Sequence, residues 1–106
     1  MNKIEQAVIY NKILGSLACA GMGDALGAAT ELYSIDEIKT QWGGFLNAFV
    51  SPPADTFAGS LNGVAGLITD DSSQMYVFSE GLIEAGFDNF TYNDWLACLL
   101  RWADMQ

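Results

Sequence analysis

The stretch Ile68-Thr69-Asp70-Asp71-Ser72 places two hydroxyl groups and two carboxylates side by side, directly before the apolar residues of an expected helix. Oxygen ligands packed this densely suit a hard divalent cation. Helix capping is the rival interpretation, because Thr, Asp and Ser satisfy unpaired amides in a first helical turn and carboxylates there favour the helix dipole. Taken alone, the stretch favours capping, because caps are common. Both interpretations predict that a helix begins here.

A second stretch, from Gly21 to Glu31, places one acid inside an apolar, glycine-rich helical segment and another acid just past its end. The inner acid, Asp24, lies among Leu, Ala and Gly residues. An unpaired buried carboxylate is costly, so Asp24 is expected to have polar partners. The glycines do not match a dinucleotide-binding loop, because Gly21-x-Gly23-x-x-x-Gly27 has the wrong spacing and no preceding strand.

Two motifs therefore follow one another in the chain. The first is Gly-Asp-Ala-Leu-Gly-x-x-x-Glu at residues 23–31, and the second is Thr-Asp-Asp-Ser at residues 69–72, followed by an amphipathic helix. In their order, spacing and residue types, the two motifs resemble those of the ADP-ribosylglycohydrolase family. The resemblance covers most of the chain but only the amino-terminal portion of the family domain. It implies hydrolysis of the glycosidic bond that joins ADP-ribose to a protein side chain or a small acceptor.

The resemblance also implies roles for individual residues. Thr69, Asp70 and Asp71 would be ligands of a two-metal site that usually holds Mg²⁺ or Mn²⁺. Glu31 would lie close to the metals and the scissile bond and act as the catalytic carboxylate. The substrate would be an ADP-ribosylated protein or an ADP-ribose-like small molecule. Supporting roles would fall to Asp24 and Ser72.

The other metal motif of the family, a late Asp-x-Asp-Thr or Asp-x-Asp-Ser, does not occur in this sequence. The acids that follow Asp71 are Glu80, Glu84, Asp88, Asp94 and Asp104. No two of them form that pattern. We therefore expect weak, partial metal binding and no appreciable activity from this chain alone, whether it is a truncated product or a complete small protein. The alternative hypothesis is a non-catalytic helical module for self-association or partner binding.

Composition argues against several classes of function. The chain has 106 residues, a net charge of −9 and only 4 Lys and Arg residues. This excess of acid argues against nucleic acid as a partner and against an anionic membrane surface. The sequence has no His, the commonest transition-metal ligand and general base. Residues 1–106 are expected to form a single domain, and the lack of a targeting or spanning pattern predicts a cytoplasmic protein.

Hydrophobic spacing and capping signals predict an all-α fold, a small orthogonal bundle of about four helices with one long loop. The helices are expected over residues 3–29, from a Ser34–Glu37 capping box to residues 43–44, from the Thr-Asp-Asp motif to Gly86, and from Thr91 onward. The long loop is expected over residues 45–66.

Small residues recur every four positions in the first predicted helix, at Gly15, Cys19, Gly23 and Gly27. Such a stripe lets another helix approach closely, so we expect tight packing there. Cys19 and Cys98 both stand in apolar helical patterns and are expected to be buried thiols.

The fourth predicted helix is apolar nearly all round, which is typical of a helix buried on more than one side. A chain this short offers little to cover it, and uncovered apolar patches usually mark interaction surfaces. We therefore expect a two-fold homodimer whose interface includes Trp95, Leu99 and Trp102.

Overall fold

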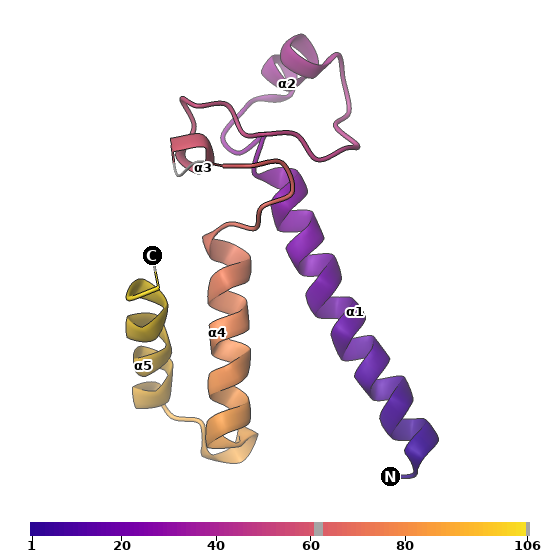
Figure 1. Ribbon diagram of the computed structural model, residues 1–106, viewed down its shortest axis with the longest axis vertical. Helices are drawn as coiled ribbons and strands as arrows, with labels where there is room; N and C mark the ends of the chain where they lie inside the picture. Colours follow the sequence, from indigo (N-terminus) through magenta and orange to yellow (C-terminus); the bar gives the residue numbers. More distant parts are fainter. Residues whose placement is uncertain (61–62, 106) are drawn as a thin grey trace. The chain divides into compact units, whose positions relative to one another are not determined.

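The computed structural model describes residues 1–60 and 63–105. In these residues every regular element is a helix, so the predicted all-α fold is confirmed (Figure 1). None of the described helices is long and apolar enough to cross a membrane. The chain divides into two compact units, Met1–Thr69 and the residues from Asp70 onward. The boundary falls inside the Thr-Asp-Asp motif.

The first unit begins with α1, Lys3–Gly27, a helix of 25 residues. Asn2 caps it, because its Oδ1 accepts hydrogen bonds from the amides of Ile4 and Glu5, each at 3.0 Å. The Glu5 carboxylate in turn accepts the Asn2 amide at 2.9 Å. This reciprocal capping box satisfies amides that have no partner inside the helix.

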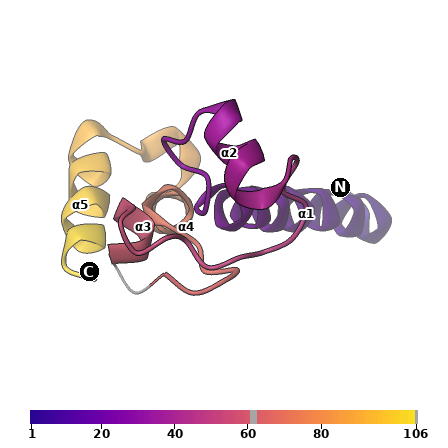
Figure 2. The same ribbon diagram turned by 90° about the horizontal axis from the view of Figure 1, so that it is seen from above.

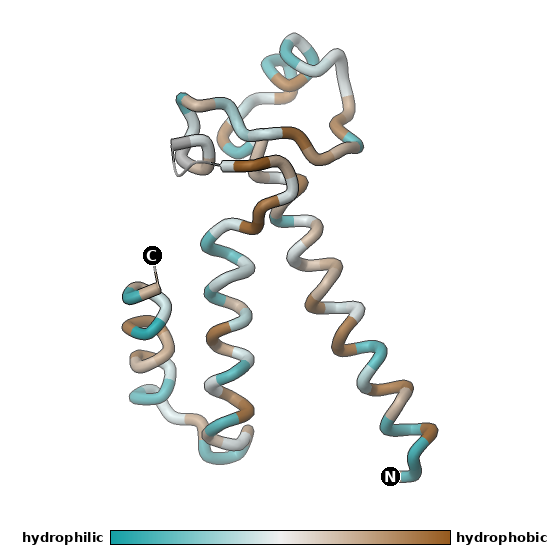
Figure 3. The backbone as a smooth tube through the Cα atoms, in the orientation of Figure 1, coloured by the Kyte–Doolittle hydropathy of each residue, from teal (hydrophilic) through white to brown (hydrophobic). Residues whose placement is uncertain are grey.

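Hydrophobic residues recur along most of α1 (Figure 3) and do not gather on one face. Ile4 is 77% exposed and Ile13 is 56% exposed. Within the first unit, no other helix packs against α1 in the residues that the structure describes. A helix with apolar residues all round and no helical neighbour presents a surface typical of an interface.

The stripe of small residues on α1 is open. A Cβ atom added at Gly15, Gly23 or Gly27 would meet no atom within 4 Å in the described part of the chain. The predicted close helix packing at this stripe is therefore not seen. Cys19, on the same stripe, is exposed, so the prediction of a buried thiol is wrong for Cys19. Among the described helices of its unit, none covers α1.

The second helix, α2, spans Ile35–Trp42 and begins at the predicted capping box. The Ser34 amide donates to Glu37 Oε2 at 2.8 Å, and the Glu37 amide donates to Ser34 Oγ at 3.3 Å. The Ser34 hydroxyl and amide together lower the pKa of the Glu37 carboxyl, because they stabilise its charged form. Gly43, with φ of +78°, ends the helix in the left-handed conformation that glycine favours.

The long connection after α2 carries one short helix, α3, Phe57–Ser60 (Figure 2). The predicted long loop is thus interrupted by a single helical turn. Gly59 is needed in this turn because a Cβ there would lie 1.9 Å from the Pro53 carbonyl oxygen. Thr56 Oγ1 donates to the same oxygen at 2.6 Å and accepts the Gly59 amide at 3.1 Å.

The second unit begins with α4, Asp70–Ala85, which starts at the Thr-Asp-Asp motif as predicted. It is followed by Gly86, with φ of +78°, and by the 3₁₀ helix η1, Phe87–Asn89. The last helix, α5, spans Tyr92–Ala103 and runs back along α4 (Figure 1).

A predicted capping box also opens α5. The Thr91 amide donates to Asp94 Oδ2 at 2.7 Å, and the Thr91 hydroxyl donates to the same oxygen at 2.5 Å. Both bonds favour the ionised carboxylate and lower the pKa of Asp94, the side-chain bond contributing most.

Close backbone approach holds α5 against α4. A Cβ atom at Gly81 would lie 2.3 Å from Cys98 Sγ, so a larger residue at this crossing would require Cys98 or the helix to move. Cys98 is buried, as predicted. Phe78 and Trp95 stack beside it, with ring centroids 6.2 Å apart and planes inclined by 19°. The two helices therefore form a packed pair.

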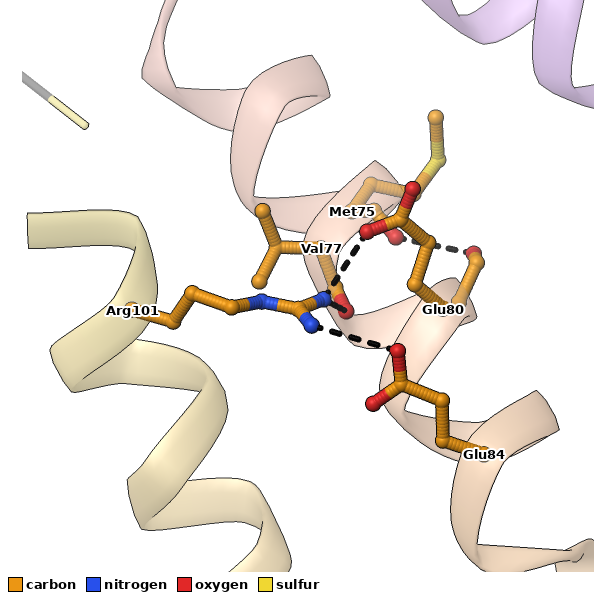
Figure 4. Close-up of polar contacts among 6 residues, drawn as sticks. Met75, Val77, Glu80, Glu84 and Arg101 are labelled. Carbon is orange, nitrogen blue, oxygen red and sulfur yellow. Dashed lines mark hydrogen bonds and ion pairs between the residues drawn. The ribbon is translucent and has the colours of Figure 1, made fainter.

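Arg101 adds polar contacts across the same pair (Figure 4). Its Nη2 lies 2.9 Å from Glu80 Oε2 and donates to the Val77 carbonyl at 3.2 Å, while Nη1 lies 3.4 Å from Glu84 Oε1. Exposed ion pairs contribute little energy individually. Their combined geometry places the guanidinium over the middle turns of α4.

Candidate functional site

Asp24 and Thr69 are brought together although 45 residues separate them in sequence. Asp24 lies in the last turns of α1, and Thr69 is the last residue before α4. The Thr69 amide donates to Asp24 Oδ2 at 2.8 Å, and the Thr69 hydroxyl donates to Asp24 Oδ1 at 2.5 Å. The polar partner that the sequence required for Asp24 is thus the threonine of the second motif.

This pairing determines which Thr69 atoms remain available. A threonine hydroxyl has one proton and two lone pairs. Because the proton is donated to Asp24, Thr69 Oγ1 can still act as an acceptor or a ligand through its lone pairs. Hydrogen bonds to a carboxylate are stronger than those between neutral groups, so Asp24 holds both the backbone and the side chain of Thr69.

Asp70 and Asp71 form the first turn of α4, in the second unit, and both are exposed. Carboxylates in a first turn interact favourably with the helix dipole. Ser72, which directly follows them, is only 2% exposed. The Thr-Asp-Asp-Ser motif therefore changes within one turn from two exposed carboxylates to a buried hydroxyl.

Glu31 lies just past α1, in the first unit, and is exposed. It lines a pocket of about 260 Å³ with Leu32, Tyr33, Glu37, Asp55 and Thr56. The pKa of Tyr33 is raised, first by desolvation and then by the negative charges of Asp55 and Glu37. No sequence pattern indicated Tyr33 or Asp55 as part of a site. Asp55 follows Glu31 by more than twenty positions, and no motif spacing connects the two.

The donor set at the second motif suits a hard cation in its chemistry. Thr69, Asp70 and Asp71 offer hydroxyl and carboxylate oxygens, which Mg²⁺ and Mn²⁺ prefer over nitrogen or sulfur. Within the described residues, no group of three or more Asp, Glu, Cys or His side chains is arranged to hold a metal. The residues fit a cation as part of a ligand set and do not by themselves surround one.

The chain was compared with known protein families, curated proteins and solved structures. The model of the family described as ADP-ribosylglycohydrolase matches residues 5–106. The chain belongs to the ADP-ribosylglycohydrolase family. No curated protein and no solved structure matches it.

Both motifs of this ADP-ribosylglycohydrolase family chain lie inside the matched range. The match also extends over both compact units. The predicted family is therefore confirmed. The roles predicted for Glu31 and for residues 69–72 stay predictions.

Proposed function

We propose that this chain contributes to metal-dependent hydrolysis of the glycosidic bond of ADP-ribose attached to a protein side chain or a small acceptor. Membership of the ADP-ribosylglycohydrolase family supports the reaction class. The observation that carries the proposal is the pairing of Asp24 with Thr69 by two hydrogen bonds. It joins the two sequence motifs at the residue that would be the neutral ligand.

Thr69, Asp70 and Asp71 would hold Mg²⁺ or Mn²⁺ through their side-chain oxygens. A bound divalent cation supplies Lewis-acid stabilisation of charge at the reacting centre. Asp24 would orient Thr69 by accepting a hydrogen bond from its hydroxyl, which leaves the lone pairs of Oγ1 for ligation. Ser72 would support the turn from its buried position.

Glu31 would act on the attacking water. As the water oxygen bonds to the anomeric carbon, a water proton would pass to the Glu31 carboxylate. The bond from the anomeric carbon to the acceptor would break, and its electron pair would leave with the acceptor atom. Transfer of one proton from Glu31 to that atom, directly or through water, would complete the hydrolysis and restore the carboxylate.

The charge of the chain bears on the substrate. A pyrophosphate would approach a protein of net charge −9, so repulsion must be offset at the site. Divalent cations at the acidic pair would supply that offset, which favours binding of ADP-ribose in the presence of Mg²⁺ or Mn²⁺ over binding without metal.

We expect no appreciable turnover from this chain alone. It carries the Thr-Asp-Asp motif but not an Asp-x-Asp-Thr or Asp-x-Asp-Ser motif, so half of the ligands proposed for two ions are missing. The assay is release of ADP-ribose from ADP-ribosylated arginine or serine protein in excess Mn²⁺. A family enzyme that carries both motifs serves as the positive control.

Turnover by the chain alone at a rate comparable to that enzyme would contradict the expectation. An Asp70→Asn, Asp71→Asn variant purified in parallel identifies the source of any signal. Activity that this variant lacks comes from the chain, and activity that it retains comes from a contaminant.

We also propose that two copies of the chain associate through α5. Trp95, Leu96 and Leu100 are 40%, 41% and 61% exposed, and such apolar clusters usually mark contact surfaces. The predicted interface residues Leu99 and Trp102, on the same helix, are half-buried.

Sedimentation equilibrium at micromolar concentration is expected to give twice the chain mass. Leu100→Lys should lower the measured mass, because it places a charge inside the contact. Gln41→Lys adds the same charge at an exposed position of the other unit and should leave the mass unchanged. A monomeric parent chain would rule out the association.

A further inference from the structure

Two hydrogen bonds link the last turn of α5 to the first turn of α4. The indole Nε1–H of Trp102 donates to Ser73 Oγ at 2.8 Å, and Ser73 Oγ donates to the Asp70 carbonyl oxygen at 3.2 Å. One hydroxyl can accept and donate at the same time. The bonds therefore run in one direction, from Trp102 through Ser73 to the backbone of Asp70.

We propose that Trp102 is a positioning residue for the acidic pair. Through Ser73 it holds the backbone of Asp70, and so the first turn of α4, in the arrangement from which Asp70 and Asp71 bind a divalent cation. This inference rests on the proposed function of the pair.

The first turn of α4 needs such support. The first amides of a helix have no intrahelical partner, so terminal turns fray readily. Two adjacent exposed carboxylates, Asp70 and Asp71, also repel one another in this turn. A tie to a neighbouring helix reduces the ordering that metal binding would otherwise require.

The position of Trp102 suits this role better than that of its neighbour. Arg101 contacts the Val77 carbonyl, Glu80 and Glu84, which lie in the middle and later turns of α4 (Figure 4). Trp102 reaches the first turn. Its half-buried indole has only two rotatable side-chain bonds, so it is a rigid anchor.

A merely structural role would make a different prediction. If the indole only packs α5 against α4, its loss lowers stability, and metal affinity falls only as far as stability does. If it positions the acidic pair, affinity falls when the hydrogen-bond chain is broken, even where the helices stay packed.

The test is calorimetric titration of the full chain with Mn²⁺, together with thermal unfolding of each variant. Trp102→Phe keeps an aromatic ring but removes the indole N–H, and Ser73→Ala removes the relaying hydroxyl. Each is expected to weaken Mn²⁺ binding roughly three- to tenfold, less than the 10- to 100-fold typical of groups that hydrogen-bond a metal ligand directly, because Trp102 acts through Ser73. The double variant should bind Mn²⁺ no more weakly than either single variant, because both substitutions interrupt the same series of hydrogen bonds.

Two further variants separate positioning from packing. Ser73→Thr keeps the hydroxyl and should bind Mn²⁺ with the affinity of the parent. Phe78→Leu removes the aromatic ring of α4 that stacks on Trp95, and should lower stability while leaving Mn²⁺ affinity unchanged.

The outcomes are distinct. If the parent binds Mn²⁺ and Trp102→Phe binds it equally well, the positioning role is overturned and the proposed function stands. Affinity that follows thermal stability across all variants, Phe78→Leu included, overturns it as well. A parent chain that binds no Mn²⁺ overturns the proposed metal site and this inference with it.

Discussion

The double substitution Asp70→Asn, Asp71→Asn is expected to weaken Mn²⁺ binding by at least about a hundredfold, since losing even residues that merely orient a metal's ligands costs 10- to 100-fold. Asn keeps the size and polarity of each side chain but removes two negative charges. A hard cation loses its charged oxygen ligands as a result. Calorimetry at constant ionic strength measures the change.

The competing explanation for weaker Mn²⁺ binding is the loss of overall negative charge, because a chain of net charge −9 attracts cations anywhere on its surface. Asp36→Asn, Asp88→Asn is the matched control, since it removes the same charge from two exposed acids outside the motif. This control should bind Mn²⁺ within about twofold of the parent, because it leaves the proposed ligands in place and salt screens exposed charges. Equal weakening by both double variants would contradict a site at Asp70 and Asp71.

The second large effect is expected at the crossing of α4 and α5. Gly81→Ala places a Cβ atom 2.3 Å from Cys98 Sγ, so the side chain or the helix must move. Overpacking of this kind costs roughly 1–3 kcal/mol of unfolding free energy. Urea unfolding followed by circular dichroism should show this loss of stability.

The sign of the effect distinguishes steric conflict from helix propensity. In an open helical position, Gly→Ala stabilises by about 0.5–1 kcal/mol. At Gly15, no atom of residues 1–60 and 63–105 lies within 4 Å of an added Cβ, so Gly15→Ala should stabilise α1. Cys98→Ala should cost less in the Gly81→Ala background than in the parent, because it removes the clashing sulfur. Stabilisation by Gly81→Ala would show that the two helices are less closely packed than described.

Local signals in the sequence predicted most of the secondary structure. The capping boxes at Ser34 and Thr91 correctly indicated where α2 and α5 begin, because a cap is a contact between residues three positions apart. Gly43 and Gly86 correctly indicated helix ends, because both take up positive φ. The Thr-Asp-Asp motif likewise indicated the start of α4.

Contacts between distant residues were predictable only in part. The apolar surroundings of Asp24 required a polar partner, but the sequence did not identify Thr69 as that partner. The hydrogen bond from Trp102 to Ser73 corresponds to no sequence pattern, because it depends on how α5 lies along α4. Cys19 was predicted to be buried but is exposed. Apolar spacing indicates a preference for burial and does not show whether another element is present to cover the residue.

The most direct test of the central claim is to locate the ion on the chain. In NMR spectra of the ¹⁵N-labelled chain, substoichiometric Mn²⁺ broadens the amide signals of residues near the ion. A metal site at Thr69, Asp70 and Asp71 predicts broadening centred on residues 69–73 and on Asp24, which is hydrogen-bonded to Thr69. Broadening centred on acids outside both motifs, such as Asp36 or Asp88, or spread evenly over all exposed acids, would contradict it.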